Sequence, residues 1–311
     1  MDLRQLRYLL DVVDAGSVSR AASRLRITQP ALGMQIKKLE GELGLPLLVR
    51  HSRGVVPTEA GSVLCARART ILRELERTQR DVTDLAGAPQ GEVALGVHAS
   101  PALALVPVLV DLMAAELPAV SLRLVEGTSD TILEALQRDQ LALGFSTRRR
   151  HEAAVAYEPL MTEDPVFIGP ASDPLAGVRP IRFVQVAQHK LLLPTAPHKI
   201  RESAEAAART LGISLDVAYE IDSVSLKKEM IRSAGGYTIL PYTAVHREVT
   251  EGSMFARRIV QPALSETLYL AWSRRTPETR AAAAVRGLIR RVVDNAIAER
   301  RWRWRKPAQA G

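Results

Sequence analysis

At 311 residues, with 47% hydrophobic and 24% charged residues, the chain has the composition of a globular protein long enough for two or three domains. It has no run of about 18 apolar residues, and its first residues lack the cleavage site of a signal peptide, so we expect a cytoplasmic protein without a membrane partner. A single cysteine, Cys65, excludes an internal disulfide framework and is expected to be a small buried residue.

The net charge of +8 is unevenly distributed along the chain. The basic excess lies in residues 1–88 and 300–311, and the long middle of the chain is close to neutral. Basic surfaces attract the phosphates of nucleic acids. This division predicts a nucleic-acid-binding module joined to a domain with a different task.

Residues 2–14 carry apolar side chains every three or four positions, which predicts an amphipathic helix. Residues 17–25 and 28–40 then predict two short helices, capped by Ser17 and Thr28. Small alanines in the first of these helices allow the pair to cross closely, as a helix-turn-helix requires. For this stretch alone, an ordinary helical hairpin buried in a larger core is the alternative.

The second helix of this pair has an apolar face for the core and a polar face for a ligand. Amide, apolar and small residues suit base edges in a major groove, and here they are Gln29, Pro30, Gly33 and Met34. Residues expected to hold the DNA backbone are Thr28, Lys37 and Lys38.

Residues 47–50 and 55–56 predict two short strands joined by a basic turn, the pattern of a β-wing. Such a wing would place Arg50, His51 and Arg53 beside the duplex. Arg53, at its tip, is the expected contact to the minor groove or to phosphate.

Residues 58–86 predict one long helix with an apolar seam of heptad spacing. The seam consists of Leu64, Ala68, Ile71, Leu75, Thr78, Val82 and Leu85. It favours a homodimer through residues 59–88, with two recognition helices at half-sites one helical turn, or a multiple, apart. A helix that packs on its own domain is the alternative.

Beyond a hinge at 86–91, strand-like and helix-like segments alternate. The predicted strands are 92–97, 120–127, 141–146, 165–170, 190–195, 217–222, 237–241 and 266–273, and a helix near 277–300 closes the chain. Alternation of this kind predicts an α/β domain of parallel sheets with helices on both faces, here long enough for two lobes.

The N-terminal segment resembles the LysR-type transcriptional regulators. The family pattern A-A-x-x-L-x-[IV]-[ST]-Q-P-[AS]-[LV] is matched from Ala21 to Leu32, and L-E-x-x-L-G follows from Leu39 to Gly44. The resemblance covers essentially the whole chain. One departure is Gly33, where the family usually has serine, and another is Met34, which is often polar, so a half-site preference does not transfer unaltered.

The resemblance implies three parts. These are a winged helix-turn-helix DNA-binding domain (1–58), a coiled-coil linker helix (59–88) and an α/β effector-binding domain (89–311) that resembles periplasmic binding proteins. In the last part, lobe I would comprise 91–163 plus 267–300, and lobe II 164–266. Members commonly act as tetramers, so a homotetramer is expected in addition to the homodimer.

In open α/β sheets, ligands bind beyond the carboxyl ends of the strands. Here small hydroxyl residues follow several predicted strands: Ser100, Thr128, Ser129, Ser146, Thr147, Thr195 and Ser223. With free helix N–H groups they suit a small anion such as a carboxylate, although Ser and Thr also cap helices. We expect the effector to contact Ser100, Thr128, Ser129, Thr147, Thr195 and Ser223; the resemblance favours Ser100, Thr128, Thr147 and Thr195.

Two basic segments are expected to be solvated rather than functional: the run Arg148–Arg150 and the tail 300–311. No metal-ligand spacing and no nucleophile–base pattern is found, so no metal, no cofactor and no enzymatic activity are expected. The sequence predicts a DNA-binding transcriptional regulator controlled by a small anionic effector in an interlobe cleft. The alternatives are a two-lobed solute-binding or enzymatic protein with an incidental helical head, and a non-specific architectural DNA binder.

Overall fold

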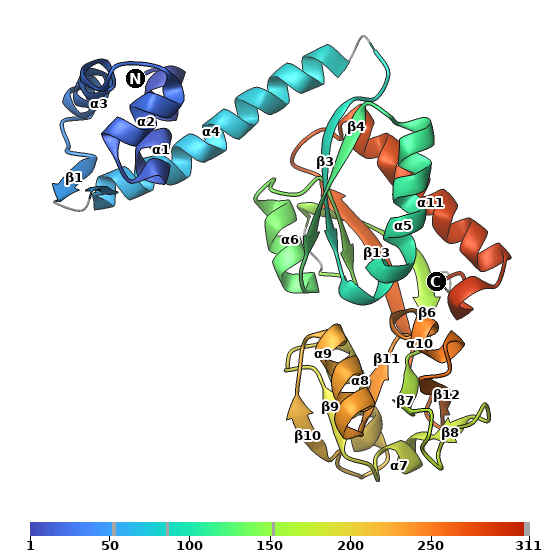
Figure 1. Ribbon diagram of the computed structural model, residues 1–311. Helices are drawn as coiled ribbons and strands as arrows, with labels where there is room; N and C mark the ends of the chain where they lie inside the picture. Colours follow the sequence, from blue (N-terminus) through green and yellow to red (C-terminus); the bar gives the residue numbers. More distant parts are fainter. Residues whose placement is uncertain (52–53, 85–86, 151–152, 308–311) are drawn as a thin grey trace. The chain divides into compact units, whose positions relative to one another are not determined.

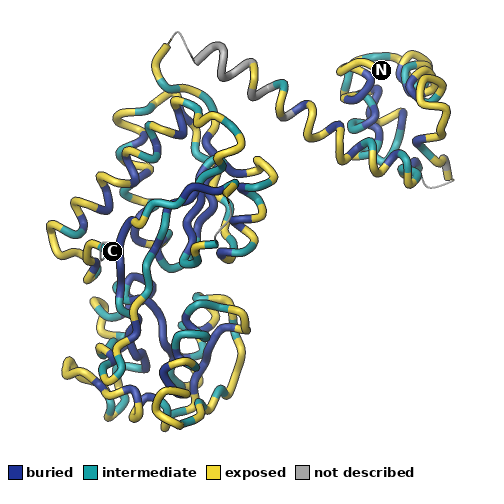
Figure 2. Tube along the Cα trace, turned by 180° about the vertical axis from the view of Figure 1, so that it is seen from behind, coloured by how far each residue is buried: buried dark blue, intermediate teal, exposed yellow. Residues whose placement is uncertain are grey.

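The structure is a computed structural model, and it describes residues 1–51, 54–84, 87–150 and 153–307 (Figure 1). The chain divides into two compact units, Met1–Gly87 and Ala88–Gly311. Each unit has hydrophobic clusters of its own, shown by the dark-blue buried segments inside each unit in Figure 2.

The N-terminal unit begins with three helices, α1 (Leu3–Ala15), α2 (Val18–Leu25) and α3 (Gln29–Leu43). Ser17 and Thr28 cap α2 and α3 by accepting backbone N–H bonds, as their positions predicted. The turn between these helices passes through Arg26, which has a left-handed backbone with φ of 56°. Ala21 is fully buried and Ala22 nearly so, which allows the close crossing that the small residues indicated.

A two-stranded antiparallel wing follows, β1 (Leu48–His51) and β2 (Gly54–Pro57). The Val55 N–H donates to the Gly16 carbonyl at 2.9 Å and so ties the wing to the turn after α1. A side chain at position 54 would not fit there, because a Cβ on Gly54 would lie 2.4 Å from the Gly16 oxygen. The start of the wing is therefore fixed against the helices.

The long helix α4 (Glu59–Asp84) uses part of the predicted seam within its own unit. Cys65, Ala68 and Leu72 are buried, and the helix packs against α1. Ile71 is 41% exposed, and Leu64 and Leu75 are partly exposed. The prediction that Ala68 belongs to an intermolecular seam was wrong; the side chain of Val82 and all of Leu85 lie outside the described part.

Lobe I is a five-stranded sheet with strand order β4-β3-β5-β13-β6. Its strands are β3 (Gly91–Val97), β4 (Val120–Glu126), β5 (Leu143–Ser146), β6 (Val155–Glu163) and β13 (Glu266–Ser273). Helices α5 (Ala99–Glu116) and α11 (Arg280–Ala298) contribute to one hydrophobic cluster and α6 (Ser129–Gln137) to another. The sheet is mixed and not parallel as predicted, because β13 runs antiparallel to both of its neighbours.

Within the described residues, α5 is the helix whose length and composition would suit a membrane span. In the fold it lies over lobe I, with Leu105, Leu109 and Met113 buried in that lobe's core. Part of its apolar surface therefore packs inside the lobe, whereas Leu103 and Val110 remain exposed.

Lobe II is a six-stranded sheet with strand order β10-β9-β11-β7-β12-β8. Its strands are β7 (Val166–Pro170), β8 (Ile181–Arg182), β9 (Leu191–Leu193), β10 (Val217–Glu220), β11 (Tyr237–Leu240) and β12 (Met254–Val260). Its helices are α7 (Phe183–Val186), α8 (Lys199–Thr210), α9 (Val224–Ala234), η1 (Tyr242–Ala244) and α10 (His246–Thr250). This sheet is also mixed, since β7 pairs antiparallel with both β11 and β12.

The expectation of a solvated tail was wrong for Trp302 and Trp304, whereas the basic residues Arg301, Arg303, Arg305 and Lys306 are exposed. After α11 the chain forms the short helix η2 (Arg301–Arg303), and Trp304 is then buried, with 4% of its surface exposed. Trp304 belongs to the hydrophobic core of lobe I, and the partly buried Trp302 packs against it. Apolar surface on the two indole rings therefore outweighs the repulsion among the neighbouring arginines.

Candidate DNA interface and effector site

The outward face of α3 carries the residues predicted to contact DNA. Thr28, Gln29, Pro30, Lys37 and Lys38 are exposed. Met34 is 67% exposed, which is unusual for a large apolar side chain, and Gly33 is partly exposed. The opposite face of the helix is buried through Leu32, Ile36 and Leu39.

The N-terminus of α3 is well defined because Thr28 Oγ1 accepts the Ala31 N–H at 3.4 Å and Pro30 occupies the first turn. In the wing, His51 is exposed. Arg53 and the side chain of Arg50 lie outside the described residues, so their predicted contacts are not placed.

In lobe I, four of the predicted effector residues lie just beyond the ends of neighbouring strands. Ser129, in the first turn of α6, is buried, and its Oγ lies 3.2 Å from the Thr147 Oγ1 and accepts the Thr147 N–H at 3.0 Å. Thr128 caps α6 and is exposed, and its Oγ1 lies 3.2 Å from the Thr131 Oγ1. Ser100, in the first turn of α5, is partly exposed.

Sequence reasoning overlooked His98, which joins this group. Its Nε2 lies 3.1 Å from the Ser129 Oγ, so the imidazole and two hydroxyls form one connected chain. His98 is the N-cap residue of α5. Its position directly after β3 was the available signal, because a polar residue there stands at the carboxyl end of a strand.

In lobe II, Thr195 and Ser223 follow β9 and β10, which pair in parallel. The Thr195 N–H donates to Asp222 Oδ1 at 2.9 Å, and Ser223 caps α9 by accepting the Leu226 N–H at 3.2 Å. Both residues are exposed. Ser223 therefore has a structural partner of its own.

Lys227, in α9, was not identified from the sequence and is only 1% exposed. Burial lowers its pKa to about 8, and the Asp222 carboxylate opposes this by favouring the charged form. At neutral pH the amine is therefore mostly protonated, although its charge has lost much of its hydration.

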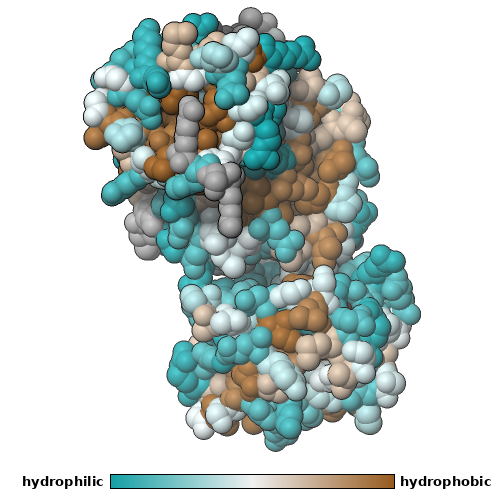
Figure 3. Space-filling model, turned by 60° about the vertical axis from the view of Figure 1, so that its left-hand side comes forward, coloured by the Kyte–Doolittle hydropathy of each residue, from teal (hydrophilic) through white to brown (hydrophobic). Residues whose placement is uncertain are grey.

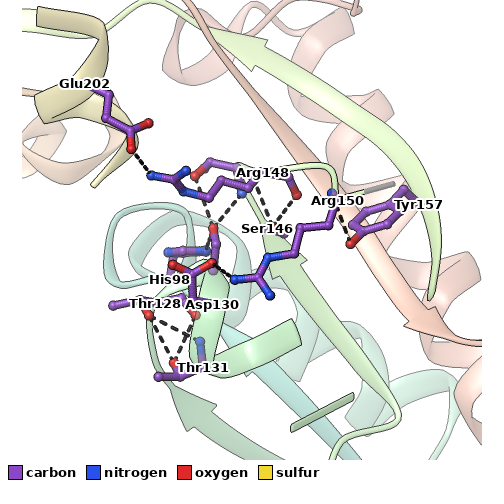
Figure 4. Close-up of polar contacts among 11 residues, drawn as sticks. His98, Thr128, Asp130, Thr131, Ser146, Arg148, Arg150, Tyr157 and Glu202 are labelled. Atoms are coloured by element: carbon purple, nitrogen blue, oxygen red, sulfur yellow. Dashed lines mark hydrogen bonds and ion pairs between the residues drawn. The ribbon is translucent and has the colours of Figure 1, made fainter. Parts of the chain in front are cut away.

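Arg148 joins the two lobes. Its guanidinium donates to Glu202 of α8 at 2.5 Å, and the two side chains are 27% and 40% exposed (Figure 4). Arg150 instead bonds to Asp130 of α6 at 2.6 Å, within lobe I. The expectation that Arg148 and Arg150 form a solvated basic run was wrong, since both are partly buried and paired; Arg149 is exposed.

Two histidines stand on either side of this junction, His98 in lobe I and His198 at the N-cap of α8 in lobe II. Burial, and for His98 the charge of His198, lowers the pKa of His98 to about 4. Burial together with the charges of Lys227 and Arg148 lowers the pKa of His198 to about 4. Both imidazoles are therefore neutral near pH 7, so they offer hydrogen bonds, and the positive charge comes from Arg148 and Lys227.

Two family models match this chain, and together they cover most of its length. Residues 3–62 match the family described as "Bacterial regulatory helix-turn-helix protein, lysR family", and residues 86–294 match "LysR substrate binding domain". The nitrogen assimilation regulatory protein nac of Klebsiella aerogenes is 32% identical over 302 residues, or 97% of this chain and 98% of that protein. The HTH-type transcriptional regulator BbuR of Bordetella bronchiseptica is 28% identical over 280 residues, or 90% and 86% of the two chains.

Solved structures show the same fold. A full-length OxyR variant from Pseudomonas aeruginosa matches with a TM-score of 0.63 at 24% identity, covering 93% of this chain and 98% of that chain. Full-length CbnR in complex with its target DNA matches with a TM-score of 0.57 at 22% identity, covering 94% and 100%. The predicted fold class is thus confirmed. Because the helix-turn-helix itself matches a family model, it is not the incidental head that the alternative of a solute-binding or enzymatic protein assumed. A helix-turn-helix domain followed by a substrate-binding domain, matched over nearly the whole chain, places this protein in the LysR family of DNA-binding transcription regulators.

Proposed function

We propose that the effector of this regulator is a small organic acid or another small anion bound between lobes I and II. The observation that carries this proposal is the pair of cations, Arg148 from lobe I and the buried Lys227 from lobe II, with the neutral His98 and His198 beside them. A dehydrated ammonium group is strongly stabilised by an anionic partner.

The hydroxyl groups of Ser129 and Thr147 and the N-termini of α6 and α8 would supply hydrogen bonds to the same ligand. Thr128 and Ser100 stand at neighbouring helix starts, and Thr195 and Ser223 would contribute from lobe II. An anion at this place would compete with Glu202 for Arg148. Ligand binding would thereby replace an existing interlobe ion pair and change the relative setting of the lobes.

The test is thermal unfolding of the full chain against carboxylates, aromatic acids, amino acids and inorganic anions. Unfolding is followed by the fluorescence of Trp272, Trp302 and Trp304, which all lie in the effector-binding unit. A ligand that binds only the folded state raises the midpoint by mass action. Lys227→Gln should abolish the rise, whereas Ser121→Ala, at the amino end of β4, should preserve it.

A rise of equal size in wild type and Lys227→Gln would place the ligand elsewhere. If none of the anions raises the midpoint, the proposal of an anionic effector fails.

We further propose that α3 reads the operator, with Gln29, Pro30, Gly33 and Met34 at base edges and Thr28, Lys37 and Lys38 at the backbone. Their exposure on one face of α3 supports this assignment. Gln29→Ala should reduce discrimination between operator and random DNA. Lys37→Ala should weaken binding to both and lower the salt slope by about one. Lys190→Ala, an exposed lysine of the effector-binding unit, is the control and should leave both unchanged.

Arg53→Ala should behave like Lys37→Ala if the wing contacts phosphate. We also propose that the protein forms a homodimer through residues 59–88 and associates further to a tetramer. Its proposed location is the cytoplasm. Exposed apolar side chains support association between chains, because patches of this kind mark interfaces (Figure 3). The exposed large apolar side chains of lobe I include Leu103, Val110 and Leu124.

A further inference from the structure

The chain crosses between the lobes on two adjacent strands, β6 leaving lobe I and β13 returning to it. Glu163, the last residue of β6, pairs in register with Glu266, the first residue of β13. The described residues after α11 lie beside this crossover, close to the end of β6 (Figure 1). We call residues 301–307 the C-terminal strap.

The strap pairs with the backbone of the departing strand. The Thr162 N–H donates to the Arg305 carbonyl at 2.9 Å, and the Arg305 N–H donates to the Thr162 carbonyl at 3.0 Å. The Arg305 guanidinium also reaches Asp164 at 2.7 Å and Ser265 Oγ at 2.9 Å. One residue of the strap therefore binds both segments that connect the lobes.

The strap is also linked to lobe II through Glu163. The Trp304 indole N–H donates to Glu163 Oε2 at 3.1 Å. The same carboxyl group accepts the N–H and the hydroxyl of Thr243, in η1 of lobe II, at 2.8 and 3.0 Å. Arg303 adds a direct contact, since its guanidinium lies 4.0 Å from the ring centroid of Tyr242, also in η1.

The backbone of the strap includes residues in the left-handed region, which the contacts of the strap must hold in place. Trp302 and Arg303 have φ values of 57° and 62°, and Arg300, just before the strap, has 53°. Left-handed backbone of this kind costs about 1 kcal/mol or more for each residue with a side chain. A strained segment near a chain end persists only where its surroundings hold it.

We propose that the C-terminal strap is a conformational device that ties lobe I and the crossover strands to η1 of lobe II and holds the two lobes in one relative setting. It rests on the proposed function only in that lobe movement would carry the effector signal. When the strap is released, η1 loses the contact of Arg303, Glu163 loses the Trp304 N–H that helps to hold it against Thr243, and the lobes move more freely. The tie requires neither effector nor DNA.

The test is amide hydrogen exchange of the full chain without effector or DNA, so its outcome is independent of the effector's identity. A chain ending at Arg300 lacks the strap, and the Thr162 N–H loses its acceptor and exchanges rapidly. The strap proposal adds that the amides of Thr243, Ala244 and Val245 in lobe II exchange about fivefold faster or more, as expected for a lost polar contact.

A matched pair of single substitutions keeps the test valid if the shortened chain folds poorly. Arg303→Ala removes the contact to Tyr242 and should raise exchange at Thr243 about two- to fivefold. Arg301→Ala is the control, because Arg301 pairs with Glu299 and its guanidinium lies over Trp302, within its own end of the chain. It should leave lobe II unchanged.

Two outcomes would contradict the strap proposal. If loss of residues 301–311 accelerates exchange at Thr162 but leaves residues 243–245 as slow as in wild type, the tail only covers the core of lobe I. Equal effects of Arg303→Ala and Arg301→Ala in lobe II would also overturn the proposal.

Discussion

At the scale of single residues, two carboxyl groups at the lobe crossover have unusual ionisation. Burial raises the pKa of Glu163 to about 7, and burial together with the charge of Glu163 raises the pKa of Glu266 to about 7. Lys199 and Arg148 act on Glu266 in the opposite direction. The Glu266 Oε1 is buried and has no hydrogen-bond partner among the described residues. The pair therefore favours a state with at least one proton near neutrality.

This pair predicts how stability changes with pH. A carboxyl whose pKa is raised in the folded state stabilises the fold at acid pH, and that contribution is lost as pH rises toward 7. Glu266→Gln removes the titration, so wild type should lose about 1–2 kcal/mol relative to the variant between pH 5 and pH 8. The measurement is the tryptophan fluorescence midpoint of both proteins across this range.

His98 and His198 contribute with the opposite sign, because their lowered pKa values favour folding as pH rises from about 4 to 6.5. They are the same in both proteins and cancel in the difference. A difference between wild type and Glu266→Gln that stays constant with pH would contradict the assignment.

Gly61 is a second residue whose role depends on a contact in the tertiary structure. A Cβ at this position would lie 2.0 Å from the backbone oxygen of Leu47, so alanine forces the start of α4 away from the wing. Gly61→Ala should destabilise the N-terminal unit by about 1–3 kcal/mol. Calorimetry should show a lower transition for that unit, with the tryptophan midpoint of the effector-binding unit unchanged.

The control is Gly41→Ala, in the interior of α3, where a Cβ would meet nothing within 4 Å. Alanine is the better helix former, so this variant should be stabilised by up to about 1 kcal/mol. Similar destabilisation by both substitutions would show that close approach is not the reason for Gly61.

At the scale of elements, α4 divides its apolar residues between two tasks. Cys65, Ala68 and Leu72 pack on α1, whereas Ile71 remains exposed beside Leu64 and Leu75. Heptad spacing alone did not distinguish these faces, because a stripe that packs inside one chain has nearly the same period as a dimer seam. The exposed part of the seam supports the proposed dimer.

Ile71→Glu should therefore shift the protein from dimer toward monomer, because it would place a charge in the proposed apolar seam. Analytical ultracentrifugation over a range of concentrations measures the shift. Ala66→Glu places the same charge at an exposed position on another face of α4 and should leave the dimer intact. A stable dimer of the Ile71 variant would move the interface to another element.

Strands that depend on distant partners were the elements that sequence reasoning overlooked. β12 contains Arg257 and Arg258, which interrupt its apolar pattern, and Arg257 donates to the carbonyls of Leu175, Arg179 and Pro180. β6 contains Pro159, which argues against a strand, yet β6 is an edge strand, where proline is tolerated. The strands that pair with β12 and β6 include β7 and β13, and these lie far away along the chain, so the local sequence does not reveal them.

At the scale of the whole molecule, a two-fold dimer would place two copies of α3 at equivalent half-sites. An insertion of about half a helical turn, ~5 base pairs, between the half-sites should weaken binding strongly, and an insertion of ~10 base pairs should weaken it less. Binding titrations at constant salt measure the effect. Equal affinity for both operators would mean that the protomers bind independently.

The sequence by itself determined the organisation of this protein: a helix-turn-helix with caps at Ser17 and Thr28, a wing, a long helix and a two-lobed α/β domain. These features follow from local spacing, capping and turn chemistry, which neighbouring residues specify. Only the tertiary structure decided which polar residues meet, such as Arg148 with Glu202, His98 with Ser129, and Trp304 with Glu163. Such pairs lie far apart along the chain, and strand pairing within lobe I and the crossover between the lobes bring them together.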